Sequence, residues 1–526
     1  MKKHLFVLGL AAVATLAACN KNTVNNDVED ATNLKIMILN RGYGTQWLSD
    51  TATAYETAHP EVKVDIQVVD TADNMETAFR SGKSKNDIDL FYDVNDYQSA
   101  SLAYTNASID GGLENLDDLY ASSIPGENVT YGDKMNASIK KELEIDGHHY
   151  TASWARATLG IYYNETVLNE ALGEGTWSLP NTSDELIALG KSFVGKGSTY
   201  ENHFCLFIKD LDLISRTLFM PWWAQYEGLE NYNRFWNGEY LDDATGNIYQ
   251  NDVRIYTQEG RRKSLMALEP LLRSDGDKLG YQYAATAQAD QFKSVQSFFY
   301  NSGRHYALYP SGDWLEAESG TGTDSVVKMM KLPVISSIIE NLPSSSIKDD
   351  TTLSKVVAAI DAGETSYDGV ADDDFARVKE ARNVSLSMAN FHLAYIPAYA
   401  NAKKLAKDFL LFSATDEAIE IYKNDVKGGF SPFQYTYDES KFTEAEKSVA
   451  AVNKDANHAF YSLKNRLFYL GNALTYNLQK ASGSSIEVAL NVPSRIKTYL
   501  TPEQYYSRFS EYYANGKWQN QVLAKL

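Results

Sequence analysis

The sequence predicts an α/β fold, and three observations lead to that class. From residue 34 onward, apolar runs typical of strands alternate with stretches that have the period of helices. A second group of strands is expected between Tyr150 and Tyr163. The chain has 526 residues, which is enough for two or three domains with their own cores. Strands and helices in alternation are typical of a mainly parallel sheet covered by helices.

The first elements follow one another regularly. Residues 34–39 form an apolar run that we expect to be a strand, and a helix is expected over 45–59. Apolar and polar residues alternate over 62–68, as in a half-buried strand. A helix over 74–80 and a strand over 88–94 complete the group. This order predicts one lobe with a mainly parallel sheet.

Later elements are marked by capping signals. Thr182 with Glu185, and Thr443 with Glu446, have the spacing of a capping box at a helix start. The other expected elements are a helix over 285–300, a strand over 305–309, an inserted helical element over 335–383, a strand over 391–396, a helix over 401–412 and a last helix from Pro502.

The N-terminus has the pattern of a secretory signal. Lys2 and Lys3 precede an apolar run over residues 5–16, which is too short to span a bilayer. The run ends in Leu-Ala-Ala-Cys, and this motif resembles the bacterial lipoprotein box. The resemblance implies removal of residues 1–18 and a lipid on Cys19.

The alternative is an ordinary signal with a chance cysteine. The chain has only two cysteines, so lipidation of Cys19 would leave Cys205 alone and exclude an intramolecular disulfide. Residues 19–33 are polar and lack aromatic side chains, and we expect them to be a flexible tether.

The charge balance excludes one class of partner. The formal net charge is −20, and nucleic-acid binding needs clustered Lys and Arg. Aromatic residues make up 12% of the chain, and exposed aromatic side chains tend to mark binding surfaces. The composition therefore favours a binding protein with an aromatic site over a nucleic-acid partner.

Four segments together resemble the extracellular solute-binding proteins of ABC importers, the broad sugar-binding family that includes maltose-binding protein. Their order and spacing carry the resemblance, which covers most of residues 34–490. The segments are Leu-Gly-Ile-Tyr-Tyr-Asn at 159–164 with the helix that follows Trp177, the strand 303–314 that ends in Gly-Asp-Trp, Ala-Tyr-Ile-Pro at 394–397 with its helix, and Phe-Tyr at 468–469 leading into 483–490.

The resemblance implies two α/β lobes of the type II periplasmic-binding-protein fold. The chain would cross a hinge between them more than once, and a ligand would lie in the cleft. Closure would trap the ligand, and the membrane permease would recognise the closed form. The expected division is 34–152 plus 388–430 for lobe 1 and 153–387 plus 431–526 for lobe 2. The inserted stretch 335–383 is longer than the family pattern leads us to expect.

Candidate ligand-binding residues combine aromatic rings with planar polar groups. A sugar presents apolar C–H faces and hydroxyls, and sites in open α/β sheets lie at strand ends. Each candidate has a structural alternative, such as a core ring, a helix cap or an ion pair. The candidates are Tyr43, Trp47, Tyr92, Asp93, Asp96, Trp154, Arg156, Trp222, Trp223, Asp313, Trp314 and Tyr469.

Trp222 and Trp223 are candidates because they are adjacent in the sequence. Two adjacent side chains of one strand point to opposite faces, so we expect one of these rings to be exposed. Asp313 and Trp314 close the Gly-Asp-Trp element, and the family resemblance supports them.

The search for catalytic motifs finds none. There is no His-Glu-x-x-His, Gly-x-Ser-x-Gly or phosphate loop. The pair His148 and His149 is interpreted as a polar pair beside a strand, and residues 261–263 (Arg-Arg-Lys) as a solvated helix face. We expect no metal, no cofactor and no catalysis.

The sequence thus predicts a monomeric, lipid-anchored carbohydrate-binding subunit of an ABC importer on the extracytoplasmic side of the membrane. Its partners would be the sugar and the permease subunits, and an oligosaccharide fits the many aromatic residues. Two alternatives stay open. One is a binding protein for a peptide, a polyamine or another small solute, and the other is a surface glycan-processing enzyme.

Overall fold

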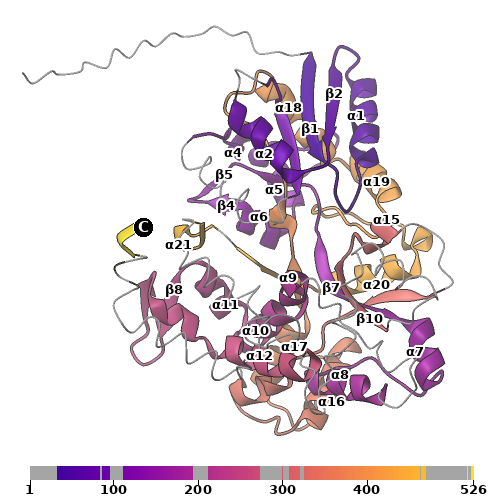
Figure 1. The fold of residues 1–526 in the computed structure, drawn as a ribbon, viewed down its shortest axis with the longest axis vertical. Helices are drawn as coiled ribbons and strands as arrows, with labels where there is room; N and C mark the ends of the chain where they lie inside the picture. Colours follow the sequence, from indigo (N-terminus) through magenta and orange to yellow (C-terminus); the bar gives the residue numbers. More distant parts are fainter. Residues whose placement is uncertain are drawn as a thin grey trace, which may run out of the picture.

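The computed structural model describes residues 32–82, 86–94, 111–193, 211–272, 299, 307–319, 325–462, 464–469, 518, 520 and 523–525. These residues form two lobes, which lie one above the other in Figure 1. Each lobe contains a five-stranded sheet with helices packed against it. The predicted α/β class is confirmed.

Lobe 1 is the upper lobe in Figure 1. Across its sheet the strands lie in the order β2 (Lys63–Val69), β1 (Asn33–Leu39), β3 (Leu90–Val94), β13 (His392–Tyr395) and β6 (Ala152–Ser153). β1 pairs in parallel with β2 and β3, whereas β13 pairs antiparallel with β3 and β6. β3 is buried along its whole length, and β2 at the edge alternates in exposure over residues 63–67, but Val68 is 47% exposed although the predicted alternation places it on the inner face.

Seven helices and a short hairpin of the described residues complete lobe 1. The helices are α1 (Gln46–Ala58), α2 (Ala72–Ser81), α4 (Asp117–Ala121), α5 (Tyr131–Lys134), α6 (Ala137–Leu143), α18 (Lys403–Ser413) and α19 (Asp416–Asp425), and the hairpin joins β4 (Glu144–Ile145) to β5 (His148–His149). The helices predicted over 45–59, 74–80 and 401–412 are confirmed, with ends that differ by a few residues.

Lobe 2 is built around β7. Its sheet has the order β10 (Leu308–Gly312), β7 (Thr158–Asn164), β12 (Val384–Ser387) and β14 (Asn457–Phe460), and β11 (Val327–Met330) also pairs with β7. β7 is antiparallel to β10, β11 and β12, and β12 is parallel to β14. All seven residues of β7 are buried, which explains its almost continuous apolar sequence.

The helices of lobe 2 pack below this sheet and beside it. They are α7 (Glu165–Leu172), α8 (Ser183–Ser192), α9 (Leu211–Ile214), a π-helical turn (Ser215–Phe219), α10 (Met220–Glu227), α11 (Leu229–Trp236), α12 (Glu259–Leu272), α15 (Leu315–Ser319), α16 (Asp350–Asp361), α17 (Asp372–Arg382), α20 (Glu444–Asn453) and α21 (Arg466–Tyr469). A hairpin of β8 (Glu239–Asp242) and β9 (Asn247–Gln250) stands beside α11. The stretch 335–383 contains α16 and α17, so its predicted helical character is confirmed.

The two predicted capping boxes have different outcomes. The box at Thr443 and Glu446 is complete, because each side chain accepts a hydrogen bond from the other residue's backbone N–H. At the start of α8, Thr182 caps the N–H of Glu185, but the Glu185 carboxylate accepts from Asn181 instead. The prediction for this second box is wrong in that half. The expected helix over 285–300, apart from Phe299, and the helix from Pro502 lie outside the described residues.

Three chain segments between the lobes are hydrogen-bonded to one another. Residues 154–157 connect β6 to β7, and the Trp154 N–H donates to the carbonyl of His392 at 3.1 Å. The N–H of Met388 donates to Ala157 at 2.9 Å, and that of Arg156 donates to Phe430 at 2.8 Å. These bonds hold three distant parts of the sequence at one place between the two sheets.

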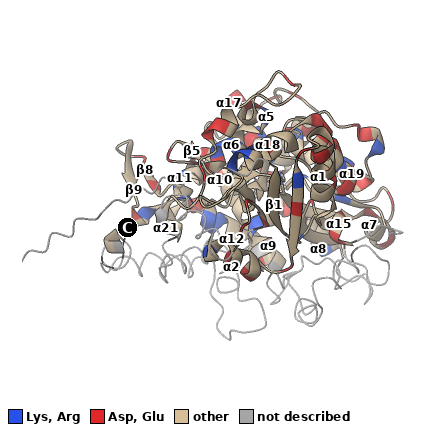
Figure 2. Cartoon of the chain, turned by 90° about the horizontal axis from the view of Figure 1, so that it is seen from above, with Lys and Arg blue, Asp and Glu red and all other residues tan. Residues whose placement is uncertain are grey.

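Positions of Lys and Arg alternate with positions of Asp and Glu along the described elements in Figure 2. No helix of the described residues is both long enough and apolar enough to cross a membrane.

Candidate functional site

The two lobes meet at a group of aromatic rings, which we name the interlobe cluster. Its members are Tyr43, Trp47, Tyr92, Trp154, Trp314, His392 and Tyr422. Trp47 stacks on Trp154 with 5.2 Å between ring centroids and 22° between planes. Tyr43 meets Trp314 edge to face at 5.9 Å. The structure therefore brings together aromatic candidates from distant parts of the sequence.

The turn after β1 places Tyr43 in this cluster. Gly42 and Gly44 have φ values of +39° and +70°, which favour glycine. A Cβ atom on Gly42 would lie 3.3 Å from the ring of Trp314, so the turn also needs a residue without a side chain for this approach. The glycine turn predicted from the sequence thus lets lobe 1 reach the Trp314 ring of lobe 2.

Asp313 is the polar centre of the contact between the lobes. It follows β10 in lobe 2 and is fully buried. Its carboxyl group accepts hydrogen bonds from the Tyr43 hydroxyl of lobe 1 and from the backbone N–H of Thr158, the latter at 3.2 Å. A buried polar group needs such partners, because water cannot reach it.

Burial raises the pKa of Asp313 to about 7. The hydrogen bonds from Tyr43 and Thr158, and the positive charges of Arg156 and Lys423, act in the opposite direction. The Tyr43 hydroxyl is also buried, and its pKa lies well above the usual value because of burial and the adjacent Asp313. The carboxyl group is therefore poised to change its charge near neutral pH.

Asp313→Asn is expected to make the free energy of unfolding less dependent on pH. Between about pH 4 and 7 the folded protein keeps Asp313 protonated, whereas the unfolded chain ionises it. Raising the pH through this window therefore lowers the free energy of unfolding of the unmodified protein. A shift of about three pKa units corresponds to at most about 4 kcal/mol. Chemical denaturation at several pH values would measure this slope, and equal slopes in the two proteins would contradict the prediction.

Arg156 lies in the crossing segment between β6 and β7 and is half-buried. Burial lowers the pKa of its guanidinium group, and the charges of Tyr437 and Asp313 act in the opposite direction. Its Nε atom is buried and has no hydrogen-bond partner among the described residues. This donor is suited to an incoming hydroxyl or carboxylate.

The remaining candidates are placed less directly. Asp93 lies beside Trp154, and the Nε1 of Trp154 donates to the backbone carbonyl of Asp93 at 3.2 Å. The side chain of Asp93 is buried. Tyr469 is the last residue of α21, and its side chain lies outside the described residues. Asp96 and Cys19 also lie outside them.

The expectation that Trp222 or Trp223 is exposed is wrong. Both rings are 0% exposed. The segment is a helix, α10, and not a strand, so adjacent side chains are covered by different neighbouring elements. Trp222 donates to the carbonyl of Pro333 at 2.9 Å, and Trp223 donates to the Gln258 side chain at 2.7 Å. In this structure both rings belong to the core of lobe 2.

The basic run 261–263 is not a solvated helix face. Arg261 is 4% exposed, and its guanidinium carbon lies 5.4 Å from the ring centroid of Trp223. Lys263 is also buried and pairs with Glu340 at 2.5 Å. The aromatic rings that cover Arg261 come from α10, α11 and the turn before α12. The sequence of α12 alone therefore could not predict that Arg261 is buried.

The histidine pair at 148–149 forms the short strand β5 itself, whereas the sequence interpretation placed it beside a strand. His148 contacts the Asp117 carboxylate at 2.7 Å, and His149 stacks on Tyr120 with 3.9 Å between ring centroids. Within the described part of the chain, no group of three or more His, Cys, Asp or Glu side chains is arranged to hold a metal ion.

Two residues of the interlobe cluster were missed in the sequence. His392 begins β13 at the second crossing and lies 5.0 Å from Trp154 between ring centroids. Tyr422 lies on α19 and meets Trp47 at 5.2 Å. The position of His392 at the start of a strand beside a crossing was the available signal. Tyr422 follows the ordinary apolar period of its helix and carried none.

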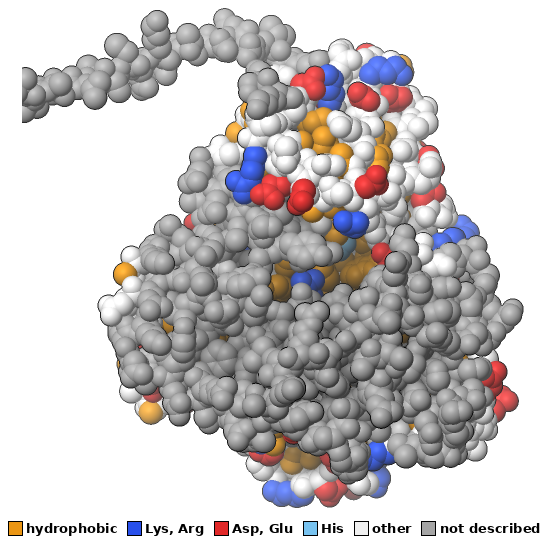
Figure 3. Space-filling view, viewed as in Figure 1, with side chains coloured by type: hydrophobic (Ala, Val, Ile, Leu, Met, Phe, Trp, Pro, Cys, Tyr) orange, Lys and Arg blue, Asp and Glu red, His pale blue; other side chains and the backbone are white. Residues whose placement is uncertain are grey.

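A small cavity lies beside the cluster. It has a volume of about 30 Å³ and is lined by Trp47, Tyr92, Trp154 and Tyr422 among others. That space suffices for a water molecule or two but not for a sugar ring. Hydrophobic and basic side chains are visible in the recess below lobe 1 in Figure 3. A larger ligand between the lobes would therefore require the rings to separate.

Comparison with known proteins adds independent information. A family model described as bacterial extracellular solute-binding protein matches residues 41–314. The diacetylchitobiose binding protein NgcE of Streptomyces coelicolor is 23% identical over 317 residues, which are 60% of this chain and 60% of the relative.

Solved structures share the fold. The apo form of RafE from Streptococcus pneumoniae has a TM-score of 0.53 at 15% identity, with 88% of this chain and 98% of RafE covered. An ABC substrate-binding protein of Listeria monocytogenes in complex with cycloalternan has a TM-score of 0.56 at 12% identity, with 92% and 98% covered. The two-lobed fold of a periplasmic binding protein, implied by the sequence resemblance, is confirmed.

Proposed function

Since the chain belongs to the bacterial extracellular solute-binding protein family, we propose that it is the lipid-anchored substrate-binding subunit of an ABC importer and binds a carbohydrate, in particular an oligosaccharide, between its lobes. The observation that carries this proposal is the interlobe cluster. Aromatic rings from both lobes surround the contact between Tyr43 and Asp313, and the adjacent crossing holds the Nε donor of Arg156, which has no partner among the described residues. Rings beside planar polar groups are the chemistry that a sugar needs. The names of NgcE and of the cycloalternan complex point to the same ligand class.

In this proposal the three hydrogen-bonded crossings act as the hinge. Residues 34–152 plus 388–430 would move against residues 153–387 plus 431–526. Opening would separate Tyr43 from Asp313, and a bound sugar would occupy the space between them. The ligand stabilises the closed form only by the contacts that it makes in the closed form and not in the open form. The permease would then take the ligand from the closed protein.

A thermal-shift panel tests the ligand class. Mono- and oligosaccharides, including diacetylchitobiose and raffinose, would be compared with peptides and polyamines. A ligand at 100 times its dissociation constant adds about 2.7 kcal/mol to the free energy of unfolding. Stabilisation by a polyamine or peptide alone would reject the sugar and support the other solute class.

Cys19→Ala is expected to release the protein from membranes without changing its fold. The proposed lipid on Cys19 would be the anchor, and the described body has no helix that could replace it. Fractionation of cells that express each form would measure this change. A Cys19→Ala protein that still sediments with membranes, as folded protein, would contradict the lipoprotein interpretation.

A further inference from the structure

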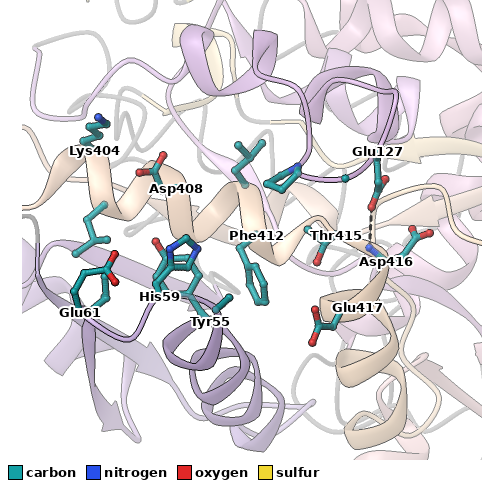
Figure 4. A pocket seen from close by; sticks show the side chains of 16 residues that line it. Tyr55, His59, Glu61, Glu127, Lys404, Asp408, Phe412, Thr415, Asp416 and Glu417 are labelled. Carbon is teal, nitrogen blue, oxygen red and sulfur yellow. Dashed lines mark hydrogen bonds between the residues drawn. The ribbon is translucent and has the colours of Figure 1, made fainter.

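A second cavity opens on lobe 1, away from the interlobe cluster. It has a volume of about 790 Å³, within the range of ligand sites. Its walls come from the end of α1, the loop at 125–127, α18 and the start of α19. The interlobe cluster uses Trp47 at the other end of α1, and Ala58 lies 11 positions after Trp47, which corresponds to about 16 Å of helix. We name this cavity the outer pocket (Figure 4).

The floor of the outer pocket is apolar. Tyr55, Val62, Leu405 and Phe412 line it and are buried. Tyr55 packs edge to face on Phe412 with 5.3 Å between ring centroids, and it also contacts His59 at 4.4 Å. This floor can hold an apolar side chain of a partner.

The rim is acidic at both ends. Figure 4 shows Glu61 and Asp408 at one end and Glu127, Asp416 and Glu417 at the other, with Phe412 between them. Lys404 is the only Lys or Arg among the lining residues. The buried Lys134 pairs with Glu127 and Asp416, both at 2.6 Å, and so balances part of one end. The rim keeps an excess of negative charge.

The carboxylates at the first end act on the floor. The pKa of Tyr55 is raised to about 12, first by burial and then by the charges of Asp408 and Glu61. The same carboxylates attract a cation to this end of the rim.

The spacing of the two ends suits an extended peptide. Asp408 lies inside α18, which ends at Ser413, and Asp416 is the first residue of α19, so five helical residues, or about 8 Å, and a turn separate the two carboxylates. An extended chain advances about 3.3 Å per residue and alternates its side chains between two faces, so basic side chains four positions apart lie on one face, about 13 Å apart, and can reach both ends. We propose that the outer pocket binds an extended basic–apolar–basic segment of a partner protein, with its apolar side chains on the floor and one cation at each acidic end.

Titration calorimetry with defined peptides tests this site on the full body of the protein. The probe is acetyl-Lys-Ser-Leu-Ser-Lys-amide, whose two Lys and one Leu lie on one face of an extended chain, and the matched peptides carry Ser or Glu in place of both Lys. We expect the Lys peptide to bind about tenfold tighter than the Ser peptide, because the Ser peptide lacks two partly exposed charge pairs. Binding of the Lys peptide should weaken as salt rises, because salt screens these pairs. Equal affinity for the Lys and Ser peptides would overturn the proposal.

Variants locate the binding. The double variant Glu61→Gln with Asp408→Asn should bind the Lys peptide several-fold more weakly. The control double variant Glu174→Gln with Asp243→Asn removes the same charge from exposed positions of lobe 2 and should bind the peptide as the unmodified protein does. Equal loss in both double variants would overturn the assigned site. If 1,5-diaminopentane binds as tightly as the peptide, the site takes small diamines and the proposed protein partner is rejected. Sugar binding between the lobes should be unchanged in all variants, so this test is separate from that of the proposed function.

Discussion

Trp223→Ala is expected to lower the free energy of unfolding by about 3–5 kcal/mol and to leave ligand affinity nearly unchanged in the protein that remains folded. The ring is fully buried and meets Phe235 edge to face at 4.7 Å. Its loss creates a cavity in lobe 2, removes the hydrogen bond to Gln258 and takes away one of the rings beside the buried Arg261. No interlobe contact is involved.

Denaturant unfolding beside calorimetric titration of a ligand from the sugar panel measures both effects. Trp177→Ala is the matched control, because this ring is only partly buried and its removal should cost less stability. A Trp223→Ala protein with normal stability and lost affinity would return Trp223 to the ligand site and contradict its assignment to the core.

Trp314→Ala is expected to have the opposite pattern, with a loss of affinity of about 60-fold and a smaller loss of stability. Trp314 is half-buried at the contact between the lobes, where it lies 6.0 Å from His392 and 5.9 Å from Tyr43 between ring centroids. If a sugar ring covers about 100 Å² of its apolar surface, the lost contact is worth about 2.5 kcal/mol.

Titration calorimetry and melting curves of the same preparations separate the two roles of Trp314. Trp314→Phe should recover part of the affinity, since a smaller ring still offers an apolar face. Unchanged affinity with a lower melting temperature would show that Trp314 is structural and would remove it from the proposed site.

Much of the fold could be predicted because its signals are local. The apolar run of β1, the alternation of β2 and the cap of α20 at Thr443 depend on residues that are neighbours in the sequence. The same holds for the glycine turn around Tyr43, which needs positive φ angles. Strand ends could also be located, and this led to Asp313 and Trp314 at the contact between the lobes.

Other predictions were wrong because they concern features that depend on tertiary packing. Pro221 and the two Trp that follow it gave no local sign of how deeply they are buried, and the helices around α10 decide that. Arg261 and Lys263 seemed solvated until the rings of α10 and α11 and the carboxylate of Glu340 were placed beside them. Glu185 has the correct spacing for a capping box, yet its carboxylate accepts a hydrogen bond from the backbone N–H of Asn181 and not from that of Thr182.

By itself the sequence determined the α/β class, the order of the first strands and helices of lobe 1 up to residue 94, and the kind of side chain from which a site could be built, because these follow from backbone preferences and apolar periodicity over a few residues. Only the tertiary structure decided which of those side chains meet. Tyr43 and Asp313 are 270 residues apart in the chain, and the hydrogen bond between them depends on three crossings that bring the two lobes together. Such a contact results from the packing of whole sheets, and no spacing within either segment encodes it.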